Sequence, residues 1–358
     1  MQPLYSIPMR KLEISDFLVT DESLPFIIAE VGHNHQGNLG QALKLIGAAA
    51  AAGASAVKFQ KRDNKNLFTP KMYNETYNSE NSFGNTYGLH RDALEFGLEE
   101  YRACMDEAES LNILFFATAF DFNSADFLQS LDMPLYKIAS GDLANLPLLE
   151  YVARFERPMI ISTGGANFEM IEAAANTIRK FHNNFAILQC TASYPAQFNQ
   201  LNLRVIDRLR LLYPENVIGY SGHDNGIAMS TAAFTLGARI IEKHFTLNRA
   251  LKGTDHAFSL EPQGLGKLVR DLRRTSEALG DGEKVIYENE KAPIRKMGKM
   301  IVAKRFIPAG TTISRDDIEL RSPADGLAPN MLEKVVGSIS KNDVGQFEPI
   351  LASSLVGW

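Results

Sequence analysis

The sequence predicts an α/β chain in which a (β/α)8 TIM barrel is followed by a small, mostly β domain. Between residue 25 and about residue 280, short apolar segments alternate with helical patterns eight times. The apolar segments are nearly continuous, as expected for parallel strands that are covered on both faces. Eight such units in about 250 residues is the usual size of a closed barrel. A charged stretch begins at Asp281, and the segments beyond it are short and β-like.

Each apolar segment is predicted to be one strand of the barrel. Their ranges are 26–31, 56–60, 113–118, 135–138, 159–162, 186–190, 217–220 and 239–245. The first helix is predicted from an apolar stripe with helical spacing, which consists of Leu39, Leu43, Ile46 and Ala50. An open, doubly wound sheet is the alternative, but no glycine-rich dinucleotide-binding loop follows the first strand. A closed barrel is therefore the prediction.

Domain boundaries follow from changes in composition. We predict a barrel domain over residues 1–280, of which 1–24 cap the bottom of the barrel. A polar insertion at 63–95 follows the second strand, so it is expected to form a lid over the C-terminal ends of the strands. Residues 281–298 are charged and weakly periodic, which predicts a linker. Residues 299–358 would form a small β domain that packs on something larger.

The composition excludes several classes of function. Hydrophobic residues make up 45% of the chain and charged residues 22%, as in globular proteins. A net charge of −5 without long basic blocks argues against nucleic-acid binding. No apolar stretch approaches the roughly 20 residues that span a bilayer, so no membrane partner is expected. The two widely separated cysteines, Cys104 and Cys190, favour a reducing compartment, and we expect a cytoplasmic protein.

Two histidines, His223 and His244, follow successive predicted strands, in the segments VIGYSGHDNG and ARIIEKHFTL. Either one alone could equally be a hydrogen-bonded histidine at a strand end. Because successive strands of a barrel end at the same rim, the two imidazoles are expected to point into one pocket. Such a pair is a plausible set of ligands for a divalent metal ion.

Polar side chains occupy the ends of all eight predicted strands. They are Glu30, Lys58, Gln60, Thr118, Lys137, Ser140, Ser162, Gln189, Thr191, Ser221, His223, Glu242 and His244. A single lysine in such a set is more often solvated, but Lys58 and Lys137 both emerge from apolar strands, where a buried ammonium group needs an anionic partner. With the neighbouring hydroxyl groups they suit a ligand that carries a phosphate and a carboxylate, as phosphoenolpyruvate does.

Eight segments resemble the sialic acid synthase family, whose members condense phosphoenolpyruvate with N-acetylmannosamine or a related sugar. In order along the barrel, they are IAEVGHNHQGNL, AVKFQK, YKIASGD, IISTGG, LQCTASYP, IGYSGHDNG, IEKHFTL and KGTDHAFSLEP. The C-terminal segment IVAKRFIPAGTTISRDDIELRSP resembles the antifreeze-like (SAF) domain of that family. The resemblance thus covers nearly the whole chain.

The resemblance implies a role for each matching position. Phosphoenolpyruvate contacts match Lys58, Thr118, Lys137, Ser140, Ser162 and Ser221. The family's rim glutamates match Glu30 and Glu242, and its metal pair matches His223 and His244. Manganese or magnesium is expected, because an open site with oxygen ligands suits these ions.

Further positions are expected to contact the substrates. Asp255 matches a sugar-binding acid, Tyr194 matches the tyrosine of the CT-x-x-YP motif, and the rim residues Gln60, Gln189 and Thr191 are expected to add contacts. The family also implies a homodimer with exchanged domains. In that dimer Arg321, in the segment LRSP, would reach the barrel of the partner chain.

The acceptor sugar is left open by the sequence. Ala192 stands where related bacterial enzymes often have asparagine, which weakens any inference about the acetamido group. Diacetamido sugars of the legionaminic or pseudaminic type and a 6-phosphorylated sugar are alternatives. Lys61, Arg62 and Arg91 could bind a phosphate, although solvated surface positions are the expectation for each. A non-catalytic glycan-binding protein is a further alternative, against which the rim of charged residues argues.

Overall fold

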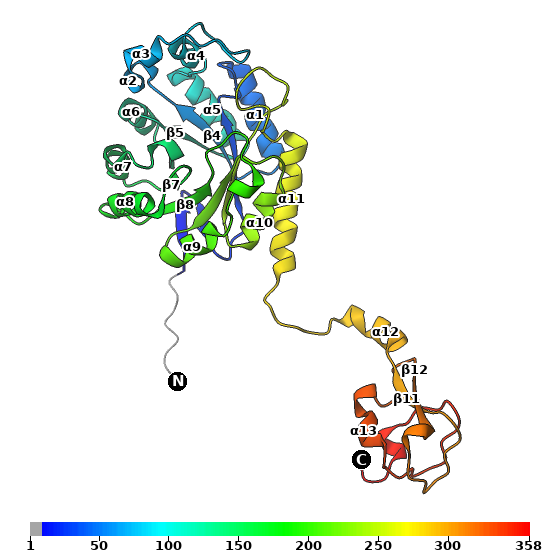
Figure 1. The fold of residues 1–358 in the computed structure, drawn as a ribbon. Coiled ribbons are helices and arrows are strands. Elements are labelled where there is room, and N and C mark those ends of the chain that lie inside the picture. Colours follow the sequence, from blue (N-terminus) through cyan, green and yellow to red (C-terminus); the bar gives the residue numbers. More distant parts are fainter. Residues whose placement is uncertain (1–8) are drawn as a thin grey trace. The chain divides into compact units, whose positions relative to one another are not determined.

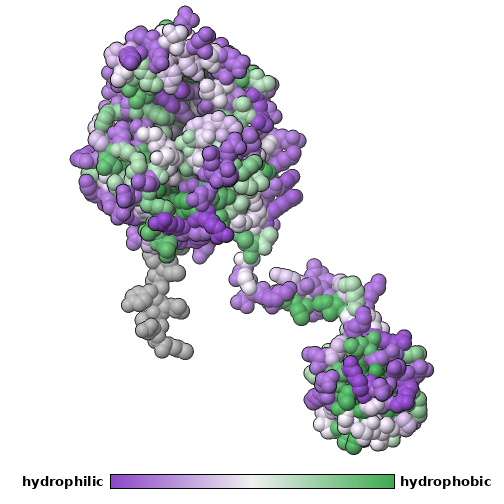
Figure 2. All heavy atoms as spheres, viewed as in Figure 1, coloured by the Kyte–Doolittle hydropathy of each residue, from purple (hydrophilic) through white to green (hydrophobic). Residues whose placement is uncertain are grey.

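The computed structural model describes residues 9–358 (Figure 1). The chain divides into two compact units, with the boundary between Leu279 and Gly280. On the face shown in Figure 2, hydrophilic side chains cover much of each unit, with smaller hydrophobic patches between them. None of the helices in the described residues is long and apolar enough to cross a membrane.

The first unit is built on a closed barrel of eight parallel strands, which confirms the predicted fold. The strands are β3 (Phe26–Gly32), β4 (Ala56–Lys61), β5 (Leu114–Ala119), β6 (Tyr136–Ile138), β7 (Met159–Ser162), β8 (Phe185–Cys190), β9 (Ile218–Gly222) and β10 (Ile240–His244). They pair in sequence order, and β10 closes the barrel against β3. The register places Glu30 of β3 opposite Lys58 of β4 and His244 of β10. The strand pairing that closes the barrel therefore brings three candidate site residues together.

Helices cover the outside of the barrel (Figure 1). They are α1 (Leu39–Ala51), α5 (Leu98–Ser110), α6 (Phe122–Ser130), α7 (Leu146–Ala153), α8 (Phe168–Arg179), α9 (Val205–Leu212), α10 (Ala228–Thr235) and α11 (Pro262–Leu279). The buried face of α1 is formed by Ala42, Leu45, Ile46 and Ala49, about one residue away from the predicted stripe. Alanines lie on several sides of this helix, so the apolar pattern alone did not identify its inner face.

A hairpin closes the N-terminal end of the barrel. Its strands, β1 (Lys11–Ile14) and β2 (Phe17–Thr20), pair antiparallel. Leu12, Ile14 and Val19 are buried in one cluster with the apolar residues of the lower barrel interior. Residues 9–24 therefore fill the bottom of the barrel, whereas residues 1–8 of the predicted cap lie outside the described part of the chain.

The insertion after β4 carries short helices. They are α2 (Asn64–Leu67), α3 (Pro70–Tyr73) and α4 (Tyr87–Asp92). The Asn81 side chain accepts a hydrogen bond from the backbone N–H of Gly253, at 2.9 Å. This bond ties the insertion to the loop that follows β10, and hence to the C-terminal end of the barrel.

The second unit has a small core of its own. It contains α12 (Glu288–Met297), β11 (Met300–Ala303), β12 (Ile318–Arg321) and α13 (Leu332–Val335), and β11 pairs antiparallel with β12. Short 3-10 helices complete the chain: η1 (Ser140–Asp142), η2 (Phe198–Gln200), η3 (Arg315–Asp317), η4 (Pro329–Met331) and η5 (Ala352–Ser354). Helix α12 lies within the segment that was predicted to be a linker. None of its residues is buried, so the sequence contains no apolar stripe from which the helix could be predicted.

Gly219, in β9, is required by the packing of the barrel interior. A Cβ atom there would lie 2.3 Å from Leu188 Cδ2 and 2.6 Å from the Ile240 carbonyl oxygen. We therefore expect Gly219→Ala to lower the free energy of unfolding by about 1–3 kcal/mol, the usual cost of overpacking. Gly266→Ala in α11 is the matched control, because nothing lies within 4 Å of its Cβ. Equal urea midpoints for the two variants would contradict this account.

Candidate active site

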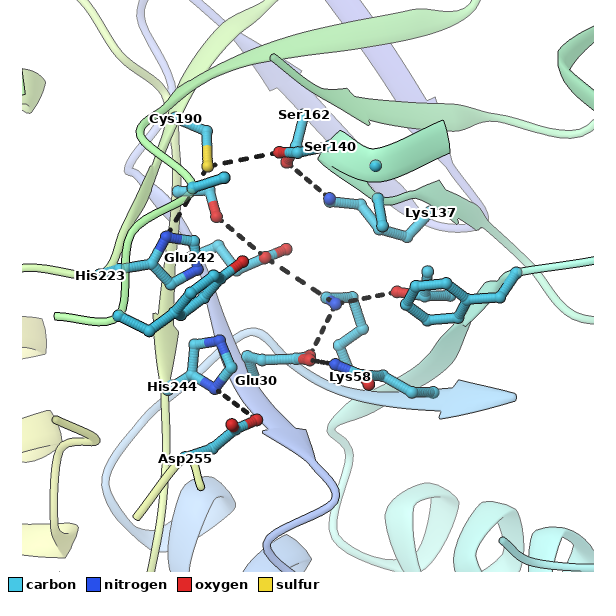
Figure 3. Close-up of a pocket in the computed structure, with 18 of the residues that line it drawn as sticks. Glu30, Lys58, Lys137, Ser140, Ser162, Cys190, His223, Glu242, His244 and Asp255 are labelled. Carbon is cyan, nitrogen blue, oxygen red and sulfur yellow. Dashed lines mark hydrogen bonds and ion pairs between the residues drawn. The ribbon is translucent and has the colours of Figure 1, made fainter. Parts of the chain in front are cut away.

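A pocket of about 550 Å³ opens at the C-terminal ends of the barrel strands (Figure 3). The structure brings most of the predicted site residues into its lining. They are Glu30, Lys58, Gln60, Thr118, Lys137, Ser140, Ser162, Tyr194, Ser221, His223, Glu242, His244 and Asp255. These side chains come from all eight strands or the loops that follow them, as the barrel topology requires.

Lys58 is the centre of a buried charge cluster at the floor of the pocket. Its ammonium nitrogen lies 2.7 Å from Glu30 Oε2 and 3.8 Å from Glu242 Oε1, and it donates to the Thr118 hydroxyl at 2.9 Å. The anionic partner that a buried lysine needs is therefore supplied in part by the chain itself. Burial raises the pKa of Glu30 to about 7, although Lys58 opposes that shift.

Lys137 is held by neutral groups. It donates to the Ser162 hydroxyl at 2.6 Å and to the Ile138 carbonyl oxygen at 3.1 Å. An ammonium group has three donors, so one remains for a ligand. Burial lowers the pKa of Lys137, and the nearby Glu242 opposes this shift. Lys137 is thus a buried cation whose bonded partners carry no charge.

The two histidines face each other, with ring centroids 5.2 Å apart. Burial, and then His244, lowers the pKa of His223 to about 3, and burial also lowers the pKa of His244. Both imidazoles are therefore neutral near pH 7. His223 Nδ1 lies 3.0 Å from the Thr191 carbonyl oxygen, so Nδ1 carries the proton and Nε2 keeps a free electron pair.

This donor set fits a divalent metal ion. His244 Nδ1 is buried without a hydrogen-bond partner, and it lies 3.6 Å from Asp255 Oδ2. Fixing one ring nitrogen by a backbone carbonyl is a common way to orient a metal-binding histidine. Within residues 9–358, no group of three or more histidine, cysteine, aspartate or glutamate side chains is placed to hold a metal ion. An ion here would need oxygen ligands from substrate or water as well.

Tyr194 and Asp255 close the histidine side of the pocket. The Tyr194 ring centroid lies 4.3 Å from that of His223, and the Tyr194 residue is exposed to solvent. Burial opposes the ionisation of Asp255, but His244 and a hydrogen bond from Thr254 outweigh it and lower the pKa of Asp255. Asp255 therefore presents a carboxylate beside the histidine pair.

The side chains of Gln189 and Thr191 are not brought into the pocket. Gln189 donates to the Leu201 carbonyl oxygen at 2.9 Å, and Thr191 donates to that of Gln200 at 3.0 Å. Successive strand residues point to opposite faces, so Gln189 faces outward while Cys190 lines the pocket. The sequence alone indicated that neighbouring residues of this strand face opposite sides. We nevertheless chose Gln189 and Thr191 because they are polar, and passed over Cys190 between them.

Two arginines line the pocket where solvated positions were expected. Arg62 Nη1 lies 2.9 Å from His33 Nε2, and Arg91 Nη1 lies 3.2 Å from His33 Nδ1. Burial, and then Arg91, lowers the pKa of Arg62 to about 10. Lys61 instead donates to the Phe96 carbonyl oxygen, at 2.8 Å, and does not line the pocket. The expectation was wrong for the arginines because Arg62 directly follows β4 at the rim of the barrel, and α4 of the insertion brings Arg91 to the same place.

Arg321 belongs to the second unit. It lies at the end of β12, where its side chain is 50% exposed and pairs with Glu319 at 2.8 Å. Its guanidinium group lies 4.1 Å from the centre of the Phe347 ring. The Phe347 and Glu319 contacts hold the side chain at the surface of this unit.

Comparison with known proteins identifies the family. Residues 45–284 match the NeuB family, and residues 298–356 match the SAF domain. The chain is 39% identical to mouse N-acetylneuraminate-9-phosphate synthase over 335 residues, which cover 92% of this chain and 93% of the mouse protein. It is 38% identical to the N,N'-diacetyllegionaminic acid synthase of Campylobacter jejuni over 328 residues, or 90% and 98% of the two chains.

A solved structure agrees with these matches. The crystal structure of the N-acetylneuraminic acid synthetase of Leptospira borgpetersenii, in complex with citrate, superposes with a TM-score of 0.70 at 35% identity. The match covers 80% of this chain and 96% of that one. The resemblance seen in the sequence is confirmed along both units, and the chain belongs to the NeuB family of sialic acid synthases, with a C-terminal SAF domain.

Proposed function

We propose that the chain condenses phosphoenolpyruvate with N-acetylmannosamine or a close relative, giving a nine-carbon 2-keto-3-deoxy sugar acid and phosphate. The observation that carries this proposal is the pairing, in one pocket, of two buried lysines with a glutamate whose pKa is raised to about 7. The names of the relatives, which are sialic and legionaminic acid synthases, support the same reaction class.

Phosphoenolpyruvate would bind between Lys58 and Lys137. Both cations are buried, and the hydroxyl groups of Thr118, Ser140 and Ser162 lie around them in the pocket lining. Charge-assisted hydrogen bonds to phosphate and carboxylate oxygens are the strong ones in such sites. The lysines would hold the phosphate before the reaction and meet its charge when it leaves.

His223 and His244 would hold a divalent ion, manganese or magnesium. When bound, the ion supplies Lewis-acid polarisation of the acceptor's aldehyde oxygen. The histidines would contribute by staying neutral, since both pKa values are lowered by burial. Asp255 and Tyr194 would bound the acceptor's side of the pocket.

Glu30 would act as the base. Bond formation between C3 of phosphoenolpyruvate and the aldehyde carbon leaves positive charge at C2, which the Glu30 carboxylate stabilises. A water molecule then adds to C2 and its proton passes to Glu30, which can return it to the alkoxide oxygen of the former aldehyde. Cleavage of the C2–O bond to phosphate, with the proton of the C2 hydroxyl passing to the departing phosphate, leaves the 2-keto group. Lys58, at 2.7 Å, and Gln60, which donates at 2.6 Å, hold the two oxygens of Glu30 in place for this role.

The C-terminal unit would complete the acceptor site in a homodimer with exchanged domains. This part of the proposal rests on the family resemblance. Its structural support is that the Arg321 side chain is half exposed, with its guanidinium group over the Phe347 ring and its Nε paired with Glu319. From a partner chain, such a group could hydrogen-bond the sugar hydroxyl or acetamido oxygens.

A direct test is phosphate release from phosphoenolpyruvate with a panel of acceptor sugars. We expect release with an N-acetylated amino sugar, its loss after chelation, and its return when manganese is added. Lys137→Met should raise the KM for phosphoenolpyruvate, because it removes a buried charge worth roughly 2–5 kcal/mol. Lys65→Met, on an exposed position of α2, is the control. Glycan binding without phosphate release from any acceptor would support the non-catalytic alternative.

The raised pKa of Glu30 predicts a pH dependence. A base works in its ionised form, so kcat/KM should rise with pH through a value near 7. The hydrogen bond from Gln60 favours the ionised form and lowers the pKa of Glu30. Gln60→Leu should therefore move this rising limb to higher pH, and Glu30→Gln should remove it together with most of the activity. A limb that stays in place in Gln60→Leu would refute the assignment of the base.

A specific feature favours a phosphorylated acceptor over the free sugar. Burial, followed by Arg62 and Arg91, lowers the pKa of His33 well below its usual value, so the ring is neutral. A neutral imidazole has one acceptor nitrogen, yet both ring nitrogens face guanidinium groups. One arginine contact therefore sets a donor against a donor, so His33 does not satisfy that guanidinium group.

The position of Glu95 favours Arg62 as that arginine. Glu95 Oε1 lies 3.5 Å from His33 Nε2, which favours a proton on Nε2 and leaves Nδ1 to accept from Arg91. Arg62 then faces an N–H group, and its guanidinium lies 3.6 Å over the Phe120 ring in the pocket lining. Arg62 also donates to Gln60 Oε1 at 2.8 Å and lies 4.0 Å from Glu95 Oε1. A phosphate on the acceptor sugar, as in N-acetylmannosamine 6-phosphate, would be an acceptor for the donors that face the His33 N–H group.

Acceptor specificity tests this second candidate. We expect kcat/KM to be higher for N-acetylmannosamine 6-phosphate than for N-acetylmannosamine or for diacetamido sugars. Arg62→Gln should lower the value for the phosphorylated sugar by roughly 10–100-fold, as loss of a charged hydrogen bond does. The loss should be smaller for the unphosphorylated sugar, where only the hydrogen bond from Arg62 to Gln60 Oε1 is affected. Lys65→Gln removes a charge from the insertion without touching the pocket and serves as control. Equal kcat/KM values for the two sugars would refute the preference for the phosphorylated acceptor.

A further inference from the structure

An ion pair between Asp224 and Lys243 is buried in the first unit outside the pocket. The Lys243 ammonium nitrogen lies 2.5 Å from the Asp224 carbonyl oxygen and 3.3 Å from its Oδ1. The Tyr220 hydroxyl donates to the same carboxylate oxygen at 2.7 Å. Both charged side chains are almost completely inaccessible to solvent, and neither has a part in the proposed chemistry.

The pair lies directly behind the two histidines. Asp224 follows His223 in the loop after β9, and Lys243 precedes His244 in β10. Side chains alternate along a strand; His244 lines the pocket, so Lys243 points out of the barrel. The register pairs Lys243 with Gly222 of β9. One ionic contact thus joins the backs of the two segments that carry the histidines.

The local backbone is adapted to this pair. A Cβ atom on Gly222 would lie 2.8 Å from Asp224 Oδ1 and 2.5 Å from Tyr220 Cε1, so the glycine leaves the space that the carboxylate fills. The other oxygen, Asp224 Oδ2, is buried without a hydrogen-bond partner. Burial also lowers the pKa of Lys243, because removal from water disfavours its charged form.

Stability alone does not account for such an arrangement. Well-packed apolar residues of similar volume usually stabilise a fold as well as a buried ion pair or better. The ladder between β9 and β10 ends at the pair Gly222 and Lys243. Beyond it, the directed contacts of Lys243 with Asp224 hold the loop that carries His223 against β10, which apolar packing would do with less geometric precision. Here those segments hold His223 and His244, whose ring centroids are 5.2 Å apart.

We propose that Asp224 and Lys243 are positioning residues that fix the separation of His223 and His244 and thereby set the affinity of the site for a divalent ion. The proposal rests on the proposed function in one respect, the assignment of the histidines as metal ligands. The pair itself touches neither substrate nor ion.

The test measures manganese binding and stability in the full-length protein. Lys243→Met leaves a buried carboxylate unpaired, so it should lower stability to urea and weaken manganese binding. The double variant Asp224→Asn with Lys243→Met removes both charges and keeps the shape of the aspartate. We expect it to regain much of the lost stability, while its Kd for manganese, measured from the electron paramagnetic resonance signal of the free ion, stays about 10–100-fold above wild type.

Asn216→Ala provides the matched control. Asn216 is buried two residues before β9, at the opposite end of that strand, where it donates to the Phe185 carbonyl oxygen at 3.1 Å. We expect this variant to lose stability and to keep the wild-type Kd for manganese. A double Asp224 and Lys243 variant that regains both stability and manganese affinity would show a purely structural role and overturn the proposal.

Failure of this inference can be told apart from failure of the proposed function. If the wild type releases phosphate from phosphoenolpyruvate but does not bind manganese or magnesium, the condensation reaction stands, whereas the metal site and the positioning role both fall. If it binds manganese but releases no phosphate with any acceptor, the function falls. The Kd values of the single and double variants then still decide the positioning role.

Discussion

The burial of charge at one end of the barrel is the constraint on which the rest of the pocket depends. Glu30, Lys58, Lys137 and Glu242 are each at most 5% exposed. An unpaired ion in such a place costs several kcal/mol, roughly, even after relaxation. Lys58 reduces this cost by lying 2.7 Å from Glu30 and 3.8 Å from Glu242. Hydroxyl groups, rather than further charges, complete the shell, and apolar side chains fill the barrel below.

This arrangement gives the two carboxylates different properties. Burial raises the pKa of Glu30 to about 7. Burial also acts to raise the pKa of Glu242, but Lys137 and Lys58 outweigh it and hold that pKa below its usual value. One carboxyl group can therefore exchange a proton near pH 7 while its neighbour stays an anion. Pairs of acids whose pKa values are separated by their surroundings are typical of acid–base sites.

The sequence predicted the barrel and most of the pocket lining because each strand, and the polar residue at its C-terminal end, can be recognised from a short segment of the chain. It failed where tertiary packing decides the outcome. Gln189 is polar and lies at a strand end, yet strand alternation turns it outward and brings Cys190 into the pocket. Arg62 and Arg91 were expected in solvent, but Arg62, directly after β4, and Arg91, on α4 of the folded insertion, both contact His33. Helix α12 has no buried face, so no hydrophobic pattern marked it.

The origin of each residue suggests how the site divides its tasks. The groups proposed to hold phosphoenolpyruvate and the metal ion lie on barrel strands or directly after them, where backbone ladders on both sides fix their positions. Arg91 lies on α4 of the insertion, which is tied to the barrel loops by isolated contacts such as that of Asn81 with Gly253. A change in the insertion can therefore alter what the outer pocket accepts without moving Lys58 or Glu30. Because the strands are the more firmly fixed elements, we infer that residues on the strands carry out the bond-forming chemistry and that residues on the loops select the acceptor.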